Sequence, residues 1–142
     1  DCIINSNVIL ANNATLAGHV VVENNAILGG NSAVHQFVRI GRFAMIGGMS
    51  GVEKDIIPYA LYTGIRENLK GINIIGLKRK GIDASTINTI NKIVKSLFNS
   101  NNTILKNIEN IEPQFLNIIE IKEIINFIKD NPKRGLCILE NG

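Results

Sequence analysis

Two histidines and three glycines in the first half of the chain are candidates for proton transfer and for binding an oxyanion. The histidines are His19 and His35, and an imidazole is the side chain that most readily moves a proton near neutral pH. The chain has no third histidine to complete a zinc ligand set, so we expect no metal. Gly18, Gly30 and Gly48 leave backbone N–H groups open to an oxyanion, although a glycine can equally relieve strain at a tight corner.

A second group of residues is basic and lies further along the chain. Lys78, Arg79 and Lys80 follow one another between two glycines, and residues 66–80 hold five Lys or Arg side chains against one Glu. Arginine suits bidentate contacts to phosphate and lysine supplies a point charge, so a nucleotide diphosphate or a phosphopantetheine carrier would fit here. A solvated basic turn is the alternative. Nucleic acid is not expected, because only 5% of the residues are aromatic and none alternates with the cations.

A six-residue repeat must position the histidines and the glycines. Every sixth residue from Ile4 to Val52 is aliphatic, and most residues four places after these are small or β-branched. A period of six fits neither the helical turn of about 3.6 residues nor a hairpin, so we interpret each repeat as one short strand and a corner. The aliphatic positions are Ile4, Leu10, Leu16, Val22, Leu28, Val34, Ile40, Ile46 and Val52.

The repeat predicts a parallel β-helix. Three repeats close one triangular coil, and residues 4–57 would stack such coils at the ~4.8 Å spacing of parallel strands until Pro58 ends the pattern. The third place of the repeat is mostly Asn or Gly, and we expect that residue to adopt the left-handed backbone of each corner. No cap precedes the open edge of the first coil, so we expect further coils upstream and interpret the chain as a C-terminal portion.

Helical patterns replace the repeat in the second half of the chain. Asp83 is expected to cap a helix whose apolar stripe reaches Phe98. Further helices are expected over residues 101–111 and 115–129, and Pro132 would end the last of them.

Length and composition fit a globular, cytoplasmic protein. The chain has 142 residues, of which 45% are apolar and 19% charged. No apolar run approaches the ~18 residues that span a bilayer, and no charged-then-apolar signal opens the chain, so no membrane span is expected. Cys2 and Cys137 lie far apart without a C-x-x-C motif, which predicts two free thiols. The patterns divide the chain into a β-helical domain over residues 1–65 and a helical domain over residues 66–142.

Four strings of residues carry a resemblance to a known family. They are A-N-N-A-T-L-A-G-H-V at 11–20, A-V-H-Q-F at 33–37, G-G-M-S-G-V at 47–52 and G-I-N-I-I-G-L-K-R-K-G at 71–81. With them the chain resembles the UDP-N-acetylglucosamine 3-O-acyltransferases, the hexapeptide-repeat enzymes that open lipid A biosynthesis. The similarity covers essentially the whole chain. Its first and last strings are more diagnostic than the repeat, which many acyltransferases share.

The resemblance implies a left-handed β-helix and a homotrimer with its active sites in the clefts between subunits. It implies transfer of an R-3-hydroxyacyl group from acyl carrier protein to the 3-hydroxyl of UDP-N-acetylglucosamine, without a metal or organic cofactor. In the family a histidine base takes the proton of that hydroxyl, and its matching position lies immediately before Asp1. Asp1 matches the carboxylate that orients the base, and Gly18 matches the backbone donor to the oxyanion. We therefore expect these 142 residues alone to lack transferase activity.

The resemblance also assigns substrate contacts on the β-helix. His19 matches a polar contact to the sugar and the acyl chain, and His35 and Gln36 match a pair that lines the substrate. Gly48 matches the position that limits acyl length, and its missing side chain suggests a long acyl group. We add Gly30 as a further corner position against the substrate.

Nucleotide contacts fall in the basic segment. Asn73 and Arg79 match contacts to the uridine and the diphosphate, with Lys80 in support. Three positions depart from the family pattern: Ile75 stands where Glu is usual, Lys80 where Arg is usual and Arg66 where His is common. Lysine keeps the charge and loses the fork geometry of arginine.

Two other functions stay open. The N-acyltransferase of the same pathway shares the β-helix and the acyl donor, although the G-L-K-R-K-G string favours the O-acyltransferase. A noncatalytic hexapeptide subunit, which assembles trimers and binds without turnover, is the alternative from another class. A histidine immediately before Asp1 in the natural protein would favour the enzyme.

Overall fold

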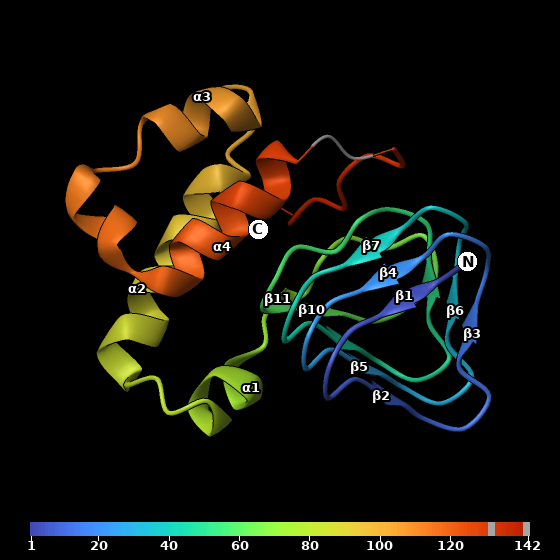
Figure 1. Cartoon of the computed structure of the whole chain (residues 1–142). Coiled ribbons are helices and arrows are strands. Elements are labelled where there is room, and N and C mark those ends of the chain that lie inside the picture. Colours follow the sequence, from blue (N-terminus) through green and yellow to red (C-terminus); the bar gives the residue numbers. More distant parts are fainter. Residues whose placement is uncertain (131–132, 141–142) are drawn as a thin grey trace.

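A triangular prism of short strands and a group of helices lie side by side (Figure 1). The computed structural model describes residues 1–130 and 133–140. The strands of the first three coils pair in parallel with those one coil further on, as Ile3 pairs with Val21 and Val21 with Arg39. These strands are β1 Ile3–Ile4, β2 Ile9–Leu10, β3 Thr15–Leu16, β4 Val21–Val22, β5 Ile27–Leu28, β6 Ala33–Val34, β7 Arg39–Ile40, β8 Met45–Ile46 and β9 Gly51–Val52. The predicted parallel β-helix is confirmed, and it is left-handed.

The aliphatic positions of the repeat fill the interior of the prism. Val22, Leu28, Ile40 and Ile46 have no exposed surface, and neither has Ala44 from the set four places later. Successive residues of a strand point to opposite faces, so each two-residue strand gives one side chain to the interior. Burying an aliphatic side chain of this size stabilises the fold by about 1.5–3 kcal/mol.

The left-handed residues of the corners stand one place later than predicted. Positive φ angles occur at the fourth place of the repeat, whereas the third-place glycines Gly18, Gly30 and Gly48 have ordinary φ angles. The fourth-place N–H donates to the third-place carbonyl one coil earlier, as Asn25 does to Ser6 at 3.0 Å, and this bond fixes which residue turns. Asparagine tolerates that backbone well, so corner strain does not explain the three glycines. The fourth-place residues with positive φ are Asn7, Asn13, His19, Asn25, Asn31, Phe37, Phe43 and Met49.

Parallel pairing continues past Pro58 in a shorter fourth coil. Strand β10 (Ala60–Tyr62) lies parallel to β8, and an isolated parallel bridge joins Gly51 to Ile65. Strand β11 (Gly71–Ile72) then adds to β10 in the antiparallel direction. The six-residue pattern did not predict this coil, because its spacing departs from the repeat.

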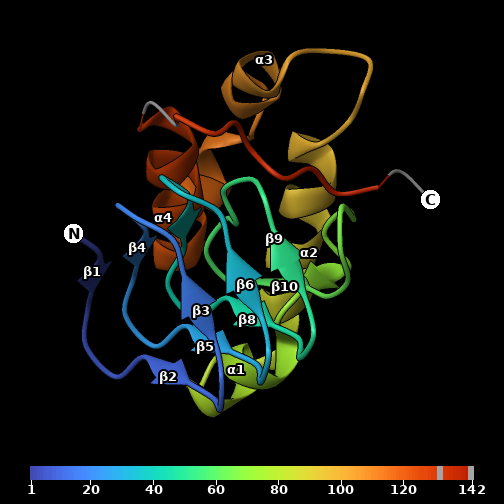
Figure 2. The same cartoon turned by 90° about the vertical axis from the view of Figure 1, so that its right-hand side faces the viewer.

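Residues 133–140, which we call the strap, cross the end of the prism (Figure 2). The Asp55 N–H donates to the Gly135 carbonyl at 2.9 Å, and the Cys137 N–H donates back to the Asp55 carbonyl at 2.9 Å. Further on, the Leu69 N–H donates to the Ile138 carbonyl at 2.8 Å. The strap therefore satisfies backbone groups that an open strand edge would leave unpaired.

The helices α1 to α4 and one 3-10 helix, η1, follow the prism. In the described residues they are α1 Ile74–Arg79, α2 Ala84–Leu97, α3 Ile104–Glu109, η1 Pro113–Asn117 and α4 Ile119–Lys129. None of them has the length and the apolar character that crossing a membrane requires.

The predicted helices form with altered ends. Asp83 caps α2 as expected, its side chain accepting a hydrogen bond from the Thr86 N–H at 2.9 Å. The second helix starts later than expected because Thr103 caps α3. The third is divided at Ile118, whose extended backbone separates η1 from α4. Pro132, expected to end that helix, lies outside the described residues.

The first coil has the open edge that the sequence led us to expect. Strands β1, β2 and β3 each stand at the end of a sheet. Ile4 and Leu10 stand at interior positions but are 48% and 39% exposed, whereas their counterparts one coil further on, Val22 and Leu28, are fully buried. The upstream coils themselves stay a prediction.

Candidate active site

The predicted site residues lie on three different corners of the prism. The histidine corner joins the sheet β3-β6-β9 to the sheet β1-β4-β7 and carries Gly18, His19, Gln36 and Phe37. Asp1 precedes β1 as His19 precedes β4, so the pairing of these strands places Asp1 and His19 in line along this corner.

Close packing orders the histidine corner. The rings of His19 and Phe37 stack with 5.0 Å between their centroids and 7° between their planes. A Cβ on residue 18 would stand 3.4 Å from Nε2 of Gln36, so the glycine makes room for that side chain. The Gly18 carbonyl accepts the Phe37 N–H at 3.0 Å, and no hydrogen bond within the described chain uses the Gly18 N–H. That N–H is the group that the resemblance assigns to an oxyanion.

His35 is tied to the strap and to the next coil. Its Nε2 lies 3.8 Å from Oε1 of Glu53, and its Nδ1 lies 3.5 Å from Nη2 of Arg134. Arg134 also donates from Nε to the Glu53 carbonyl at 3.2 Å. The end of the described chain therefore reaches the same corner as His19, which the sequence did not predict.

The glycine corner joins the sheet β2-β5-β8-β10-β11 to the sheet β3-β6-β9 and carries Asn12, Gly30 and Gly48. A Cβ on Gly48 would stand 3.3 Å from the Gly30 carbonyl oxygen, and one on Gly30 would stand 3.4 Å from the Asn12 carbonyl oxygen. Backbone of successive coils therefore forms a strip without side chains along this corner from Gly30 to Gly48. Met49 flanks the strip and is 70% exposed.

The aromatic corner joins the sheet β1-β4-β7 to the sheet with β2 and carries Phe43 and Tyr59, whose rings stack at 5.5 Å. Helix α1 begins beside it, where a solvated turn was one expectation for the basic segment. The Asn73 side chain caps α1 by accepting the Gly76 N–H at 3.0 Å, and it donates to the Phe43 carbonyl at 2.9 Å. Both ends of the Asn73 amide therefore have protein partners.

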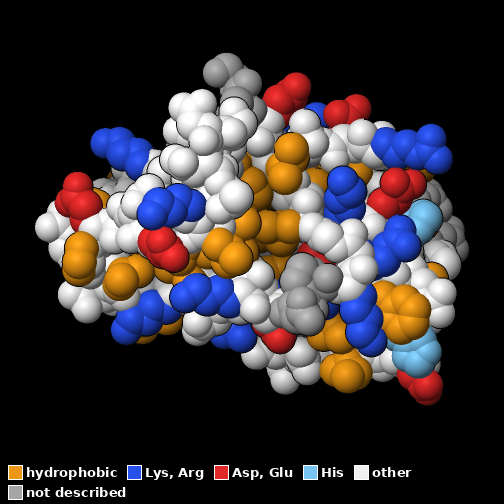
Figure 3. Space-filling view, turned by 90° about the horizontal axis from the view of Figure 1, so that it is seen from above, with side chains coloured by type: hydrophobic (Ala, Val, Ile, Leu, Met, Phe, Trp, Pro, Cys, Tyr) orange, Lys and Arg blue, Asp and Glu red, His pale blue; other side chains and the backbone are white. Residues whose placement is uncertain are grey.

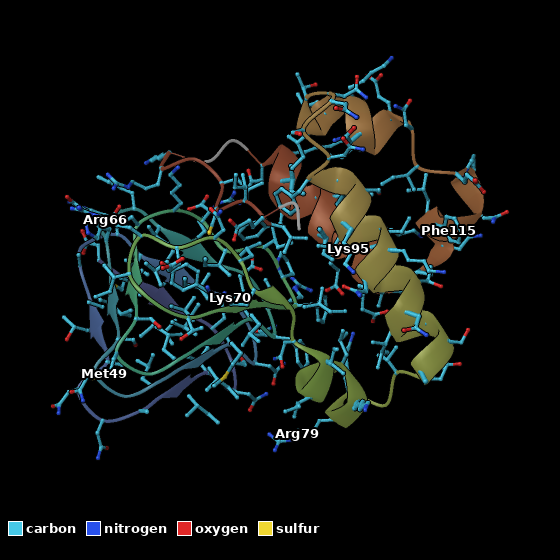
Figure 4. The ribbon with its side chains drawn as sticks, turned by 180° about the vertical axis from the view of Figure 1, so that it is seen from behind. Met49, Arg66, Lys70, Arg79, Lys95 and Phe115 are labelled. Atoms are coloured by element: carbon cyan, nitrogen blue, oxygen red, sulfur yellow. The ribbon has the colours of Figure 1, made fainter. Side chains whose placement is uncertain are left out.

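A cavity of about 640 Å³ lies beside α1 over the outer face of β2, β5 and β8. Most of its lining is apolar, including Ile9, Ile27, Met45 and Ile74, and Arg79 contributes a cation. Figure 4 shows the Arg79 side chain pointing away from the body of the molecule. Small-molecule sites have volumes of about 300–1,000 Å³ and a few polar groups on an apolar lining, which this cavity matches.

Lys80 points into the junction between the prism and the helices. Its Nζ lies 2.5 Å from Oε2 of Glu120 and donates to the Tyr59 hydroxyl at 3.1 Å. That hydroxyl donates to Oε1 of Glu123 at 2.7 Å, and Arg42 pairs with the other oxygen of Glu123. Burial and the Glu123 carboxylate raise the pKa of Tyr59 far above its ordinary value, which keeps the phenol protonated. The charge of Lys80 is therefore compensated inside the protein.

Sequence reasoning missed the partners of Lys80. Two signals were present. Glu120 stands among the apolar residues of the α4 segment, where a carboxylate that the fold buries requires a cation, and in the structure it is only 6% exposed. Arg42 stands at the third place of the repeat, where Asn and Gly are usual.

A second junction, the Arg39–Asp55 clamp, was also missed. Asp55 is fully buried and accepts the Arg39 N–H at 2.8 Å and the Arg39 Nε at 2.9 Å. The guanidinium lies 4.0 Å from the ring centroid of Phe127 and donates to the Phe127 carbonyl at 3.1 Å. Its Nη1 lies 3.4 Å from a carboxylate oxygen of Asp130. The clamp fastens the end of α4 to the prism.

The three sets of site residues lie apart on one chain, because two occupy separate corners of the prism and the third lies at α1. The histidine corner holds the residues assigned to acyl chemistry, the glycine corner those assigned to chain length, and α1 those assigned to the nucleotide. Within residues 1–130 and 133–140, no three His, Cys, Asp or Glu side chains are grouped to hold a metal ion.

Comparison with known proteins adds to this geometry. The family profile described as "Udp N-acetylglucosamine O-acyltransferase; Domain 2" matches residues 55–137. The acyl-[acyl-carrier-protein]–UDP-N-acetylglucosamine O-acyltransferases of Sinorhizobium fredii and Agrobacterium fabrum are 41% and 42% identical to the chain. Each alignment covers 100% of this chain and 53% of the relative. The chain thus spans about half the length of the curated relatives it matches.

Solved structures agree with the sequence relatives. The UDP-N-acetylglucosamine acyltransferase of Arabidopsis is 34% identical with a TM-score of 0.88, over 96% of this chain and 51% of that one. The enzyme of the same name from Campylobacter jejuni is 34% identical with a TM-score of 0.85, over 99% of this chain and 54% of that one. With the profile match over more than half of its residues, the chain belongs to the UDP-N-acetylglucosamine O-acyltransferase family.

Proposed function

We propose that the full-length protein transfers an R-3-hydroxyacyl group from acyl carrier protein to the 3-hydroxyl of UDP-N-acetylglucosamine, the first step of lipid A biosynthesis. The observation that carries this proposal is the family membership, together with the glycine and histidine positions of the resemblance on exposed corners of the prism. The names of the relatives state the same donor carrier and the same acceptor. A cytoplasmic location fits these substrates.

In the proposed reaction a histidine base takes the proton of the sugar hydroxyl, and the oxygen attacks the thioester carbonyl carbon. The carbon–sulfur bond then breaks, and the thiolate leaves with the proton that the base returns. The Gly18 N–H, which lacks a described protein acceptor, would donate to the oxyanion that forms at the carbonyl. Asp1 would orient the base from its place in line with His19. Neither His19 nor His35 occupies the position that the resemblance assigns to the base.

A homotrimer accounts for the separation of the site residues. One prism presents the histidine corner, the glycine corner and α1 in different directions, so one chain alone does not surround a substrate. A cleft between two copies would bring the histidine corner of one copy opposite another corner of its neighbour. His19, His35 and Gln36 would line the sugar and acyl region of this cleft, and Gly30 and Gly48 would border the acyl chain.

Asn73 and Arg79 would bind the nucleotide at the start and the end of α1. Arg79 is exposed and its guanidinium is suited to a diphosphate. Lys80, whose charge Glu120 compensates, would support the nucleotide contact indirectly by tying the end of α1 to α4. Ile75 is 65% exposed where the family usually has Glu, so it offers the uridine an apolar contact. The pairing of Gly51 with Ile65 supports a β-helical domain over residues 1–65, with residues 66–142 as the second domain.

The test is acyl transfer by the purified full-length protein. We expect it to acylate UDP-N-acetylglucosamine from 3-hydroxyacyl carrier protein and to give the 3-O-acyl product by mass spectrometry. Acylation of the free amine of UDP-3-O-acylglucosamine instead would identify the N-acyltransferase of the pathway. Binding of both substrates without product would identify a noncatalytic subunit, and either result would reject the proposal.

A further inference from the structure

The strap brings two cations to the histidine corner that no assigned role uses. Lys133 Nζ stands 4.9 Å from the centroid of the Phe37 ring, which also stacks on His19. Arg134, the next residue, reaches Nδ1 of His35 at 3.5 Å. The Gly135 carbonyl accepts the Asp55 N–H and so fixes the strap backbone to the prism directly after these two cations.

Positive charge is in excess around this corner. Lys54 lies one coil beyond Gln36, and Arg66 extends from the fourth coil to within 3.3 Å of a Glu53 carboxylate oxygen. Glu53 pairs with Arg66, and in the described part of the chain Lys54, Lys133 and Arg134 form no ion pair. Figure 3 shows the two histidines beside Lys and Arg side chains at one edge of the face seen from above.

A small cavity continues the cationic surface under the strap. Its volume is about 240 Å³, and Lys54 and Arg66 line it together with Glu53 and Glu67. Glu67 lies 3.7 Å from Lys70, which balances its charge. Two of the four cations, Lys54 and Arg66, therefore line a hollow next to the histidine corner, where Arg66 pairs with Glu53.

Like charges gathered in this way repel one another unless an anion joins them. A cation held over an aromatic ring keeps its N–H donors available to a further partner. Arginine recognises phosphate through its fork and lysine through its point charge, so a phosphate group is the anion that this set fits best.

We propose that Lys133 and Arg134 bind a phosphate ester group of a substrate at the histidine corner, with Lys54 and Arg66 completing the site. This inference rests on the proposed function, whose two substrates both carry such a group. One is the diphosphate of the nucleotide sugar, and the other is the phosphodiester of the pantetheine arm on the carrier. The strap thereby acts as one wall of the substrate site as well as the cap of the prism.

The experiment measures equilibrium binding of two probes, UDP and 4′-phosphopantetheine, to the full-length protein by isothermal titration calorimetry. The test variant is Lys133→Glu. The matched control is Lys92→Glu, which makes the same charge change at an exposed position on α2. We expect Lys133→Glu to raise the Kd of one probe about fivefold or more, while Lys92→Glu leaves both Kd values within about twofold. The probe that responds identifies the source of the phosphate.

A second variant, together with thermal melts, distinguishes weaker binding from impaired folding. Arg134→Lys keeps the charge and loses the fork, so it should weaken the same probe by less than Lys133→Glu does. If Lys133→Glu and Arg134→Lys melt as the wild type does and bind both probes unchanged, the proposal is wrong. Failure of the wild type to bind either probe also rejects it. Binding without acyl transfer would reject the proposed function and leave the phosphate site standing.

Discussion

Gly48 makes acyl-chain length depend on one residue. A side chain there would start 3.3 Å from the Gly30 carbonyl oxygen and project over the side-chain-free strip of the glycine corner. We expect Gly48→Met to shift selectivity toward shorter 3-hydroxyacyl donors by about tenfold in kcat/KM, a difference of ~1.4 kcal/mol. The measurement is kcat/KM over a series of donors with the full-length protein. Met49→Ala is the control, and equal chain selectivity in Gly48→Met and the wild type would contradict the assignment.

Arg79 and Lys78 form a matched pair for the nucleotide contact. Both are exposed in the last turn of α1, and the resemblance assigns only Arg79 to the diphosphate. We expect Arg79→Ala to raise the Kd of UDP-N-acetylglucosamine about tenfold, since a hydrogen bond to a charged group contributes ~1.5–3 kcal/mol. Lys78→Ala should leave that Kd within about twofold. Equal affinities in both variants, measured by calorimetry, would remove Arg79 from the site.

At the scale of single residues, the sequence predicted which residues lie on the corners better than it predicted where side chains point. His19, Gln36 and Gly48 lie on exposed corners as the repeat requires, because a six-residue period leaves little choice of position. Lys80 was expected to face the nucleotide and instead faces Glu120, because its partner comes from a helix 40 residues further along. The signals at Glu120 and Arg42 indicate that each needs a partner, but they do not identify Lys80 as that partner.

At the scale of elements, the Arg39–Asp55 clamp joins helix α4 and the strap to the prism. Removing one partner of a buried ion pair leaves the other charge buried without a partner. We therefore expect Asp55→Ala to lower the free energy of unfolding by about 3–5 kcal/mol. Asp130 contacts the same arginine, but its side chain is 81% exposed, and Asp130→Ala should cost about 0–1 kcal/mol. Urea unfolding of both variants is the measurement. Similar losses of unfolding free energy in Asp55→Ala and Asp130→Ala would show that burial does not determine how strongly each carboxylate stabilises the clamp.

Elements with local signals were predicted, and those made by distant contacts were not. The Asp83 cap and the apolar stripe of α2 are readable within one helix, and both are present. The strap and the fourth coil depend on pairings such as Asp55 with Leu136, for which neither segment has a repeat or a helical period. The corner residue was misplaced by one position because the hydrogen bond that selects it joins two coils.

At the scale of the whole molecule, Cys137 reports whether the strap is closed on the prism. Burial raises the pKa of the Cys137 thiol to about 11, from an ordinary value of ~8.5. Below pH ~8.5 the thiol is protonated in both the folded and the unfolded protein. Above that pH the thiol of the unfolded protein ionises first, so the free energy of unfolding falls as the pH rises toward the pKa of the folded state. We expect Cys137→Ala to abolish this part of the loss of stability at alkaline pH, measured as the melting temperature against pH.

Cys2 supplies the control, because it is exposed at the opposite end of the chain. Cys2→Ser should leave the slope of stability against pH between 8.5 and about 11 unchanged. In the 142-residue chain, whose open first coil leaves Cys2 exposed, a thiol reagent at pH 8 should modify Cys2 promptly and Cys137 slowly. Equal rates at the two cysteines would show that the strap is open in solution.

The whole-molecule architecture was the most predictable level. A strict repeat specifies the prism, since each coil uses the same pairing as the one before it. The placement of the histidine and glycine sets on two separate corners follows from counting along that repeat, whereas the nucleotide set lies beyond it at α1. The way in which the helices pack on the prism was not predictable, because it depends on the junctions around Lys80 and Arg39.

The strap also bears on the order of biosynthesis. Arg134 and the carbonyl of Glu53 that it contacts are 81 residues apart, so a ribosome exposes the last coils well before it releases their cover. During that interval the nascent chain presents unpaired strand edges, which are the groups that promote association between chains. Production of this protein should therefore depend on translation speed and on chaperones that shield an emerging solenoid.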